Sequence, residues 1–98
     1  MKQRITCIIS GRVQGVLYRD FTKRTADKLQ IKGEVENLPD GTVRVEAESE
    51  EDKLAEFRSI LGKGSTFSKV EGVVCESQDD LKGFEQFKIK YRSFWDRI

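Results

Sequence analysis

The chain has 98 residues, of which 18 are Lys or Arg, 17 are Asp or Glu and none is His. This length makes one domain, which can bury about 60–65% of its unfolded surface without disulfides or metals. The formal net charge of +1 produces no long-range field toward nucleic acid or a membrane surface, so any anion binding has to be local. The absence of histidine excludes histidine as a general base. Without a cysteine pair at metal-ligand spacing, it also argues against a transition-metal site.

The N-terminal apolar run is short and is interrupted by Thr6. It therefore resembles neither a signal peptide nor a transmembrane span, and we expect a cytoplasmic protein that does not bind membranes. Cys7 and Cys75 both lie within strand patterns, where buried reduced thiols are expected rather than a disulfide. The highly charged composition of a small domain favours a monomer.

The first half of the chain predicts a strand, a helix and a hairpin. Apolar residues alternate over residues 4–10 and recur at helical spacing over about 18–30. Residues 31–37 and 42–48 each predict a strand, and the turn residues of 38–41 join them. The side chains expected to face the core are Ile5, Cys7, Ile9, Phe21, Ala26, Leu29, Val43, Val45 and Ala47.

The second half predicts another helix and two further strands. Ser49 has the character of an N-cap with Asp52 three residues on, and Gly62 is a natural C-terminal stop. Leu54, Phe57, Ile60 and Leu61 give this helix its apolar stripe. Residues 70–75 predict a fourth strand, and the alternation of Phe87, Ile89 and Tyr91 predicts a fifth.

This element order is that of the α+β ferredoxin-like fold, a split β-α-β sandwich. We expect an antiparallel sheet of four to five strands with both helices on one face. A right-handed crossover makes the first two strands parallel, so the end of strand one and the end of strand two share one sheet edge. Asn37 ends strand two, on the same side as Val35 and opposite Glu34 and Glu36. It is therefore expected beside residues 11–19, although it could also serve only as a turn residue.

Residues 11–19 connect the first strand to the first helix and contain two glycines and two arginines. Such a turn leaves backbone N–H groups unpaired at the positive end of a helix dipole, which suits phosphate. An ordinary loop with solvated arginines would have the same spacing, and the segment is neither a P-loop nor a Gly-x-Gly motif. Arg19, however, falls in the first helical turn, where a cation is unfavourable unless an anion lies beside it.

Two segments resemble the signatures of the acylphosphatase family. The first is Gly11-Arg12-Val13-Gln14-Gly15-Val16 followed by Leu17, Tyr18 and Arg19; the second is Gly33-Glu34-Val35-Glu36-Asn37, three residues, then Gly41-Thr42-Val43. The likeness covers about residues 4–91, so we expect an acylphosphatase-like domain over 1–91 and a C-terminal extension over 92–98. Tyr18, Glu34, Glu36 and Ser49 depart from the usual family residues, and the two glutamates could weaken anion binding.

The resemblance implies hydrolysis of a small acyl phosphate to a carboxylate and inorganic phosphate. It implies catalytic roles for Arg19, as the phosphoryl clamp, and Asn37, which positions the attacking water. It also implies phosphate binding mainly by backbone amides of Gln14, Gly15, Val16, Leu17, Tyr18 and Arg19. No metal or cofactor is expected, because a carboxylate departs without a general acid and a loose phosphoryl transition state needs mainly positioning and charge stabilisation.

The sequence is also compatible with two other classes of function. A noncatalytic module could use the same loop to bind a phosphorylated ligand, and only turnover of an acyl phosphate separates it from the enzyme. RNA-recognition modules share the element order, but residues 42–48 hold no aromatic side chain to stack on a base, and the net charge is small. We therefore expect no nucleic-acid partner.

Overall fold

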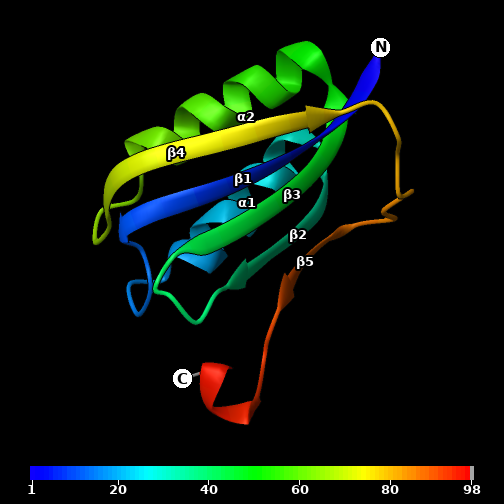
Figure 1. Cartoon of the computed structure of the whole chain (residues 1–98). Helices are drawn as coiled ribbons and strands as arrows, with labels where there is room; N and C mark the ends of the chain where they lie inside the picture. The colour runs from blue at the N-terminus through cyan, green and yellow to red at the C-terminus, as the bar shows by residue number, and fades with distance from the viewer. Residues whose placement is uncertain (98) are drawn as a thin grey trace.

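The computed structural model describes residues 1–97 as one sheet with two helices and a short C-terminal turn (Figure 1). Every element expected from the sequence is present, and the C-terminal turn is an addition. In chain order the elements are β1 (Lys2–Arg12), α1 (Tyr18–Leu29), β2 (Lys32–Asn37), β3 (Val43–Glu50), α2 (Glu51–Lys63), β4 (Lys69–Gln78), β5 (Phe87–Lys90) and the 3-10 turn η1 (Phe94–Arg97).

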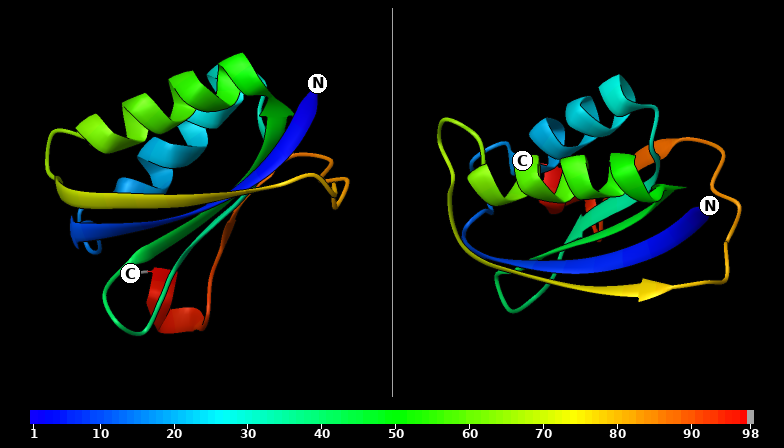
Figure 2. Two further views of the ribbon diagram at one scale, coloured as in Figure 1. Left: turned by 45° about the horizontal axis from the view of Figure 1, so that its top comes forward. Right: turned by 90° about the horizontal axis from the view of Figure 1, so that it is seen from above.

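The five strands form a single sheet in the order β4-β1-β3-β2-β5. Both helices lie over one face of this sheet, and the other face carries none (Figure 2). The ferredoxin-like fold is thereby confirmed, but the expectation of an antiparallel sheet is wrong at one edge, where β5 pairs parallel to β2. The reason is that residues 79–86 carry the chain from the β4 edge to the opposite edge, so β5 runs in the direction of β2.

The core lies between the sheet and the helices, and the predicted alternation fills it. Ile5, Cys7 and Ile9 of β1 are buried, as are Val43, Val45 and Ala47 of β3. Phe57 and Leu61 of α2, Tyr18 and Ala26 of α1, and Phe87 of β5 complete the layer, with Phe57 and Phe87 packed edge to face. Strands β1 and β2 are separated by β3 and run parallel to each other, which brings their C-terminal ends to one edge of the molecule.

The ends of α2 differ from those predicted. Ser49 is buried and belongs to β3, while Glu50 takes the N-cap position without a side-chain cap. The prediction of Ser49 as N-cap is therefore wrong by one residue, because β3 stays paired with β1 as far as Glu50 opposite Lys2. At the other end α2 continues past Gly62, and Gly64 ends it with a φ of 76°, a conformation that suits glycine.

The expectation of reduced cysteines is also wrong. Cys7 and Cys75 form a disulfide between β1 and β4, and the part of the chain that the structure describes contains no free cysteine. The two residues are direct partners in the strand register, so their side chains leave the sheet side by side. Hydrophobic periodicity predicts that each cysteine lies in a strand, but it does not predict the register between β1 and β4. The sequence alone therefore did not show that Cys7 and Cys75 are paired.

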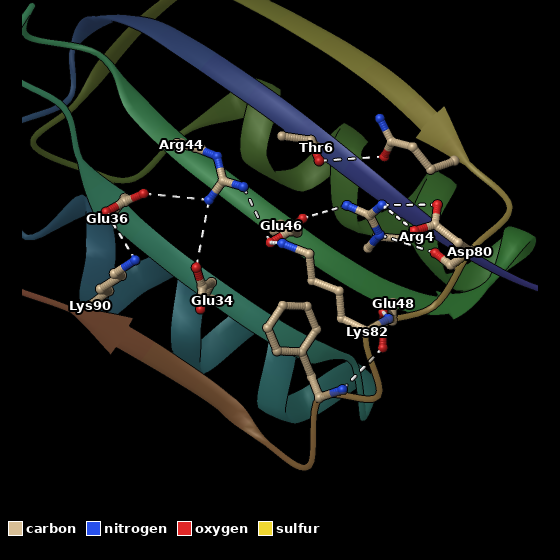
Figure 3. Close-up of polar contacts among 12 residues, drawn as sticks. Arg4, Thr6, Glu34, Glu36, Arg44, Glu46, Glu48, Asp80, Lys82 and Lys90 are labelled. Carbon is tan, nitrogen blue, oxygen red and sulfur yellow. Dashed lines mark hydrogen bonds and ion pairs between the residues drawn. The ribbon is translucent and has the colours of Figure 1, made fainter.

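The outer face of the sheet carries a network of ion pairs around Glu46 (Figure 3). Glu34 and Glu36 belong to this face and lie 3.6 and 3.4 Å from Nη1 of Arg44. They therefore point away from the side of β2 that carries Asn37. Arg44 contacts both glutamates, and Lys90 lies 4.0 Å from Glu36. The effect of these glutamates on anion binding stays a prediction. No helix within residues 1–97 is both long and apolar enough to cross a membrane.

Candidate active site

The β1–α1 loop, residues 13–17, turns sharply by means of two residues in the left-handed region. Gly15 has a φ of 73°, and a Cβ there would meet no atom within 4 Å, so backbone conformation rather than crowding selects glycine. Leu17, the N-cap of α1, has a φ of 64°, which costs a non-glycine residue about 1–2 kcal/mol. Strain of this kind in a sharp turn is typical of functional sites.

The turn leaves a row of backbone donors open. Within the described residues, no N–H from position 14 to position 20 donates a hydrogen bond to the chain, and the first helical bond runs from the Phe21 N–H to the Leu17 carbonyl at 3.1 Å. The positive end of the α1 dipole lies behind these groups. The loop therefore has the unpaired donors that an anion requires, as predicted from the sequence.

Arg19, in the first turn of α1, is held by the C-terminal segment. Its Nη1 lies 3.0 Å from Oδ1 of Asp96, and its Nη2 donates a 2.6 Å hydrogen bond to the Asp96 carbonyl. The ring of Tyr91 covers the guanidinium with its centroid 5.0 Å from Cζ. A carboxylate of the same chain therefore lies beside Arg19, and a bound anion between Arg19 and the loop amides stays a prediction. Nη1 is buried and, among the described residues, makes only this ion pair and no hydrogen bond.

Asn37 ends β2 with its side chain on the core side of the sheet, and it is only 6% exposed. Its Oδ1 is buried and has no hydrogen-bond partner in the described part of the chain. A buried amide oxygen without a partner is costly, so this atom points to a ligand or a water molecule. The β2–β3 turn has stabilising contacts of its own, because the Thr42 N–H and hydroxyl both donate to Oδ1 of Asp40. The alternative that Asn37 serves only as a turn residue therefore does not explain its unpaired buried oxygen.

A small cavity of about 100 Å³ brings these groups together. Arg19 and Asn37 both line it, which confirms that the two motifs are neighbours although 18 positions separate them in the sequence. The loop contributes Gly15 and Leu17, and β5 contributes Ile89. The complete lining is Val13, Gly15, Leu17, Tyr18, Arg19, Asp20, Asn37, Ile89 and Tyr91.

Gln14 has a role that the sequence did not show. Its side-chain amide donates hydrogen bonds to the carbonyls of Leu38 (2.9 Å) and Thr42 (2.8 Å), which joins the β1–α1 loop to the β2–β3 turn. The spacing between the loop donors and Asn37 therefore depends on the Gln14 side chain as well as on the sheet. No local pattern in the sequence reports a contact across 24 to 28 residues.

Tyr18 anchors the first turn of α1 to the core. Its hydroxyl donates a 2.7 Å hydrogen bond to the Leu61 carbonyl of α2, and burial raises the pKa of the phenol well above its usual range. The Tyr18 side chain therefore stays a neutral structural donor, and only its backbone N–H remains open toward a ligand. Leu17 has the opposite orientation, since its side chain is largely exposed beside the cavity.

Sequence reasoning missed Tyr91, which lines the cavity, and Asp96, which lies outside the cavity lining and contacts Arg19. Tyr91 was expected only as the end of an alternating strand, and Asp96 belongs to an extension for which the sequence had no account. Asp96 is 8% exposed in its side chain. Burial alone would raise the pKa of its carboxyl, but the Arg92 N–H and the charge of Arg19 bring that pKa below its ordinary value. Asp96 is thus an anion that faces Arg19.

Comparison with known proteins places the chain in a family. Residues 5–89 match the Acylphosphatase family. An acylphosphatase of Bacillus licheniformis is 46% identical over 86% of this chain and 93% of its own length. The crystal structure of acylphosphatase from Bacillus subtilis has a TM-score of 0.89 at 38% identity, covering 93% of this chain and 100% of that one. An acylphosphatase structure from Coxiella burnetii has a TM-score of 0.86 at 29% identity, covering 91% and 93%.

The fold and these relatives together define the class of protein, a small α+β hydrolase. The chain belongs to the acylphosphatase family, and the resemblance stated from its two signatures is confirmed. The predicted activity of an acylphosphatase is confirmed with it. Which residues perform that activity is a separate question, which the cavity geometry addresses.

Proposed function

We propose that the chain hydrolyses acyl phosphates without a metal, with the backbone amides of residues 14–19 and the Arg19 guanidinium holding the phosphoryl group and Asn37 holding the attacking water. One observation carries this assignment. Residues whose backbone N–H groups are unpaired, Gly15, Leu17 and Tyr18 among them, line one cavity of about 100 Å³ together with Arg19 and Asn37, and these last two side chains each hold a buried polar atom without a hydrogen bond to any described residue. The products are a carboxylate and inorganic phosphate.

The chemistry of the substrate supports a site without a metal. The leaving group is a carboxylate whose conjugate acid has a pKa of about 4, so it departs without a proton donor. The bond between phosphorus and the acyl oxygen breaks, and a new bond forms between phosphorus and the water oxygen. Charge that develops on the equatorial phosphoryl oxygens is met by fixed N–H donors and by one cation, which is the main requirement of a loose transition state.

Asn37 supports the water rather than the phosphoryl group in this proposal. Its buried Oδ1 is an acceptor that needs a donor, and the water nucleophile is a donor of suitable size for the cavity. A carboxamide is neither protonated nor deprotonated at neutral pH, so Asn37 cannot act as a general acid or base and acts by orientation. Orientation of a nucleophile beside the reacting atom is a large contribution in reactions that need little acid–base catalysis.

Turnover of benzoyl phosphate in the presence of a chelator tests the proposal. We expect Arg19→Ala and Asn37→Ala each to lose about 10²-fold or more in kcat, because each removes a group that acts in the transition state. Arg24→Ala is the matched control, since Arg24 is exposed on the same helix. Thermal unfolding of each variant checks that the fold is intact. Near-wild-type turnover by either site variant would exclude that residue from its role.

The same assay separates the enzyme from a phosphate-binding module. Chelator-insensitive release of phosphate by the wild-type chain supports the proposed reaction. Binding of inorganic phosphate with no turnover of benzoyl phosphate would instead favour the noncatalytic module. Turnover that chelator abolishes and added metal restores would contradict the absence of a metal from the mechanism.

The sequence also predicts a monomer in the cytoplasm, with residues 92–98 as an extension of the family domain, and we retain these as proposals. The charged composition supports the monomer, and the family match that ends at residue 89 supports the extension. The Cys7–Cys75 disulfide argues against a reducing compartment. Thiol labelling in lysates that are first quenched with acid and then denatured addresses the location, because Cys7 is buried in the native fold. Both cysteines should be labelled in a cytoplasmic protein, whereas the disulfide should block labelling in an oxidising compartment.

A further inference from the structure

The C-terminal segment contacts Arg19, the cation that is proposed to bind the phosphoryl group of the substrate. After β5 the chain turns back, and η1 lies near the end of the sheet that carries the β2–β3 turn (Figures 1 and 2). This places the Asp96 carboxylate and the Asp96 carbonyl on Nη1 and Nη2 of Arg19, at 3.0 and 2.6 Å. The Arg19 and Asp96 side chains are only 16% and 8% exposed, so water screens the pair weakly.

The contacts of Arg19 are those that a phosphoryl group would make. A guanidinium binds phosphate through parallel N–H donors of its two terminal nitrogens, and Asp96 contacts both of them. The match is incomplete, because Nη1 is paired in charge but makes no hydrogen bond. Asp96 is also absent from the residues that line the cavity. A ligand inside the cavity can therefore offer Arg19 the hydrogen bond that Asp96 does not provide.

The Asp96 turn is closed by bonds within itself. The Arg92 N–H donates to Asp96 Oδ2 at 2.9 Å, and the Asp96 N–H donates to the Ser93 carbonyl at 3.2 Å. These bonds span three to four residues, and the segment lies outside residues 5–89 that match the family. Strand pairing of β5 ends at Lys90, so release of the turn from Arg19 would break none of the pairing in the sheet.

We propose that Asp96 is an internal competitor of the substrate, a carboxylate that occupies Arg19 in the ligand-free enzyme and thereby sets the affinity for the phosphoryl group. The inference rests on the role proposed for Arg19. Asp96 belongs to the same chemical class as the carboxylate product, and its charge repels a second anion on the same guanidinium. If the turn is docked for about 70–90% of the time, the apparent affinity falls by about 3- to 10-fold.

Calorimetric titration of the full-length Asp96→Asn variant with inorganic phosphate tests the proposal. The amide keeps the shape of the side chain and removes its charge. We expect Kd for phosphate and KM for benzoyl phosphate to fall by about 3- to 10-fold, with kcat unchanged or raised. Asp79→Asn is the control, because it removes one exposed charge near the end of β4, at the opposite end of β1 from the loop. Its constants should equal those of the wild type.

The opposite direction of change would overturn the proposal. If Asp96→Asn binds phosphate with unchanged or lower affinity, Asp96 does not compete, and a lower affinity would make it a positioning residue for Arg19. Asp96→Ala provides a second test because it removes the side chain entirely, and both variants keep the backbone carbonyl that accepts from Nη2 of Arg19. If Arg19→Ala loses turnover but neither Asp96 variant binds phosphate more tightly, the role of Arg19 stands and the competition by Asp96 is refuted. Normal turnover in Arg19→Ala would refute the Arg19 assignment itself.

Trp95 gives a second readout that does not depend on activity. It is the single tryptophan of the chain, it precedes Asp96, and it is 76% exposed. Saturation with phosphate should lower its fluorescence anisotropy in the wild type, because the turn leaves Arg19. In Asp96→Asn the anisotropy should already be low without phosphate. An anisotropy that phosphate leaves unchanged in the wild type would contradict displacement of the turn.

Discussion

Removal of the Glu46 charge should destabilise this fold more than any other single change on the outer face of the sheet. The Glu46 side chain is 1% exposed, and three cations surround it: Arg4 Nη1 at 2.6 Å, Lys82 Nζ at 3.0 Å and Arg44 Nη2 at 3.2 Å. Figure 3 shows these side chains converging on it from β1, β3 and the segment that follows β4. Glu46→Gln keeps the size of the side chain and leaves three cations without their common anion.

The expected loss in free energy of unfolding is about 3–5 kcal/mol, the range observed when one partner of a buried ion pair is removed. For 98 residues the entropy of unfolding is about 0.2 kcal/mol/K, so Tm should fall by about 15–25 °C. Glu76→Gln is the matched control, since Glu76 is exposed on β4 and a surface change of this kind stays within about 0.5 kcal/mol. Thermal and urea unfolding, followed by circular dichroism, measure both variants.

The dependence on pH gives the same prediction a second test. Burial would raise the pKa of Glu46, but the hydrogen bonds from Lys82 and Arg4 and the charge of Arg44 lower it below its ordinary value of 4.5. A lowered pKa in the folded state stabilises the protein above pH 4.5, and this contribution disappears as the pH falls through the folded-state pKa. The difference between wild type and Glu46→Gln should therefore shrink below pH 4.5. A difference under about 1 kcal/mol at pH 7 would show that desolvation cancels the ion pairs and would refute the reasoning.

Three further predictions concern the core and the site. Reduction of the Cys7–Cys75 disulfide, which spans 68 positions, should lower the free energy of unfolding by about 4 kcal/mol. Thermal unfolding with and without reductant measures this loss. If reductant also destabilises Cys75→Ser, the disulfide is not the cause. Tyr18→Phe leaves a buried carbonyl of α2 unpaired and should cost about 1–3 kcal/mol in urea unfolding, with phosphate affinity retained. Gln14→Ala removes both side-chain hydrogen bonds between the β1–α1 loop and the β2–β3 turn. The kcat for benzoyl phosphate should therefore fall by about 10-fold or more. Unchanged kinetics would show that the sheet alone positions Asn37.

The candidate site contains features that the sequence could predict and features that it could not. Arg19 and Asn37 could be placed together because a crossover rule fixes the direction of β2 relative to β1, and both side chains line the observed cavity. The side-chain role of Gln14 could not be predicted, since its two acceptors are backbone carbonyls in a turn 24 to 28 residues away. The alternation of β2 did place Glu34 and Glu36 on the face opposite Asn37, but Arg44 as their partner required the strand register.

By itself, the sequence determined the elements, their order, the buried faces and the two motifs, because hydrophobic periodicity and turn chemistry act over a few residues. Only the tertiary structure decided the parallel pairing of β5, the disulfide between β1 and β4, the burial of Glu46 among three cations and the contact of Asp96 with Arg19. Each of these depends on register or on closure of a long loop. Their free energy comes from partners far apart along the chain, and no local pattern records which partner each group will meet.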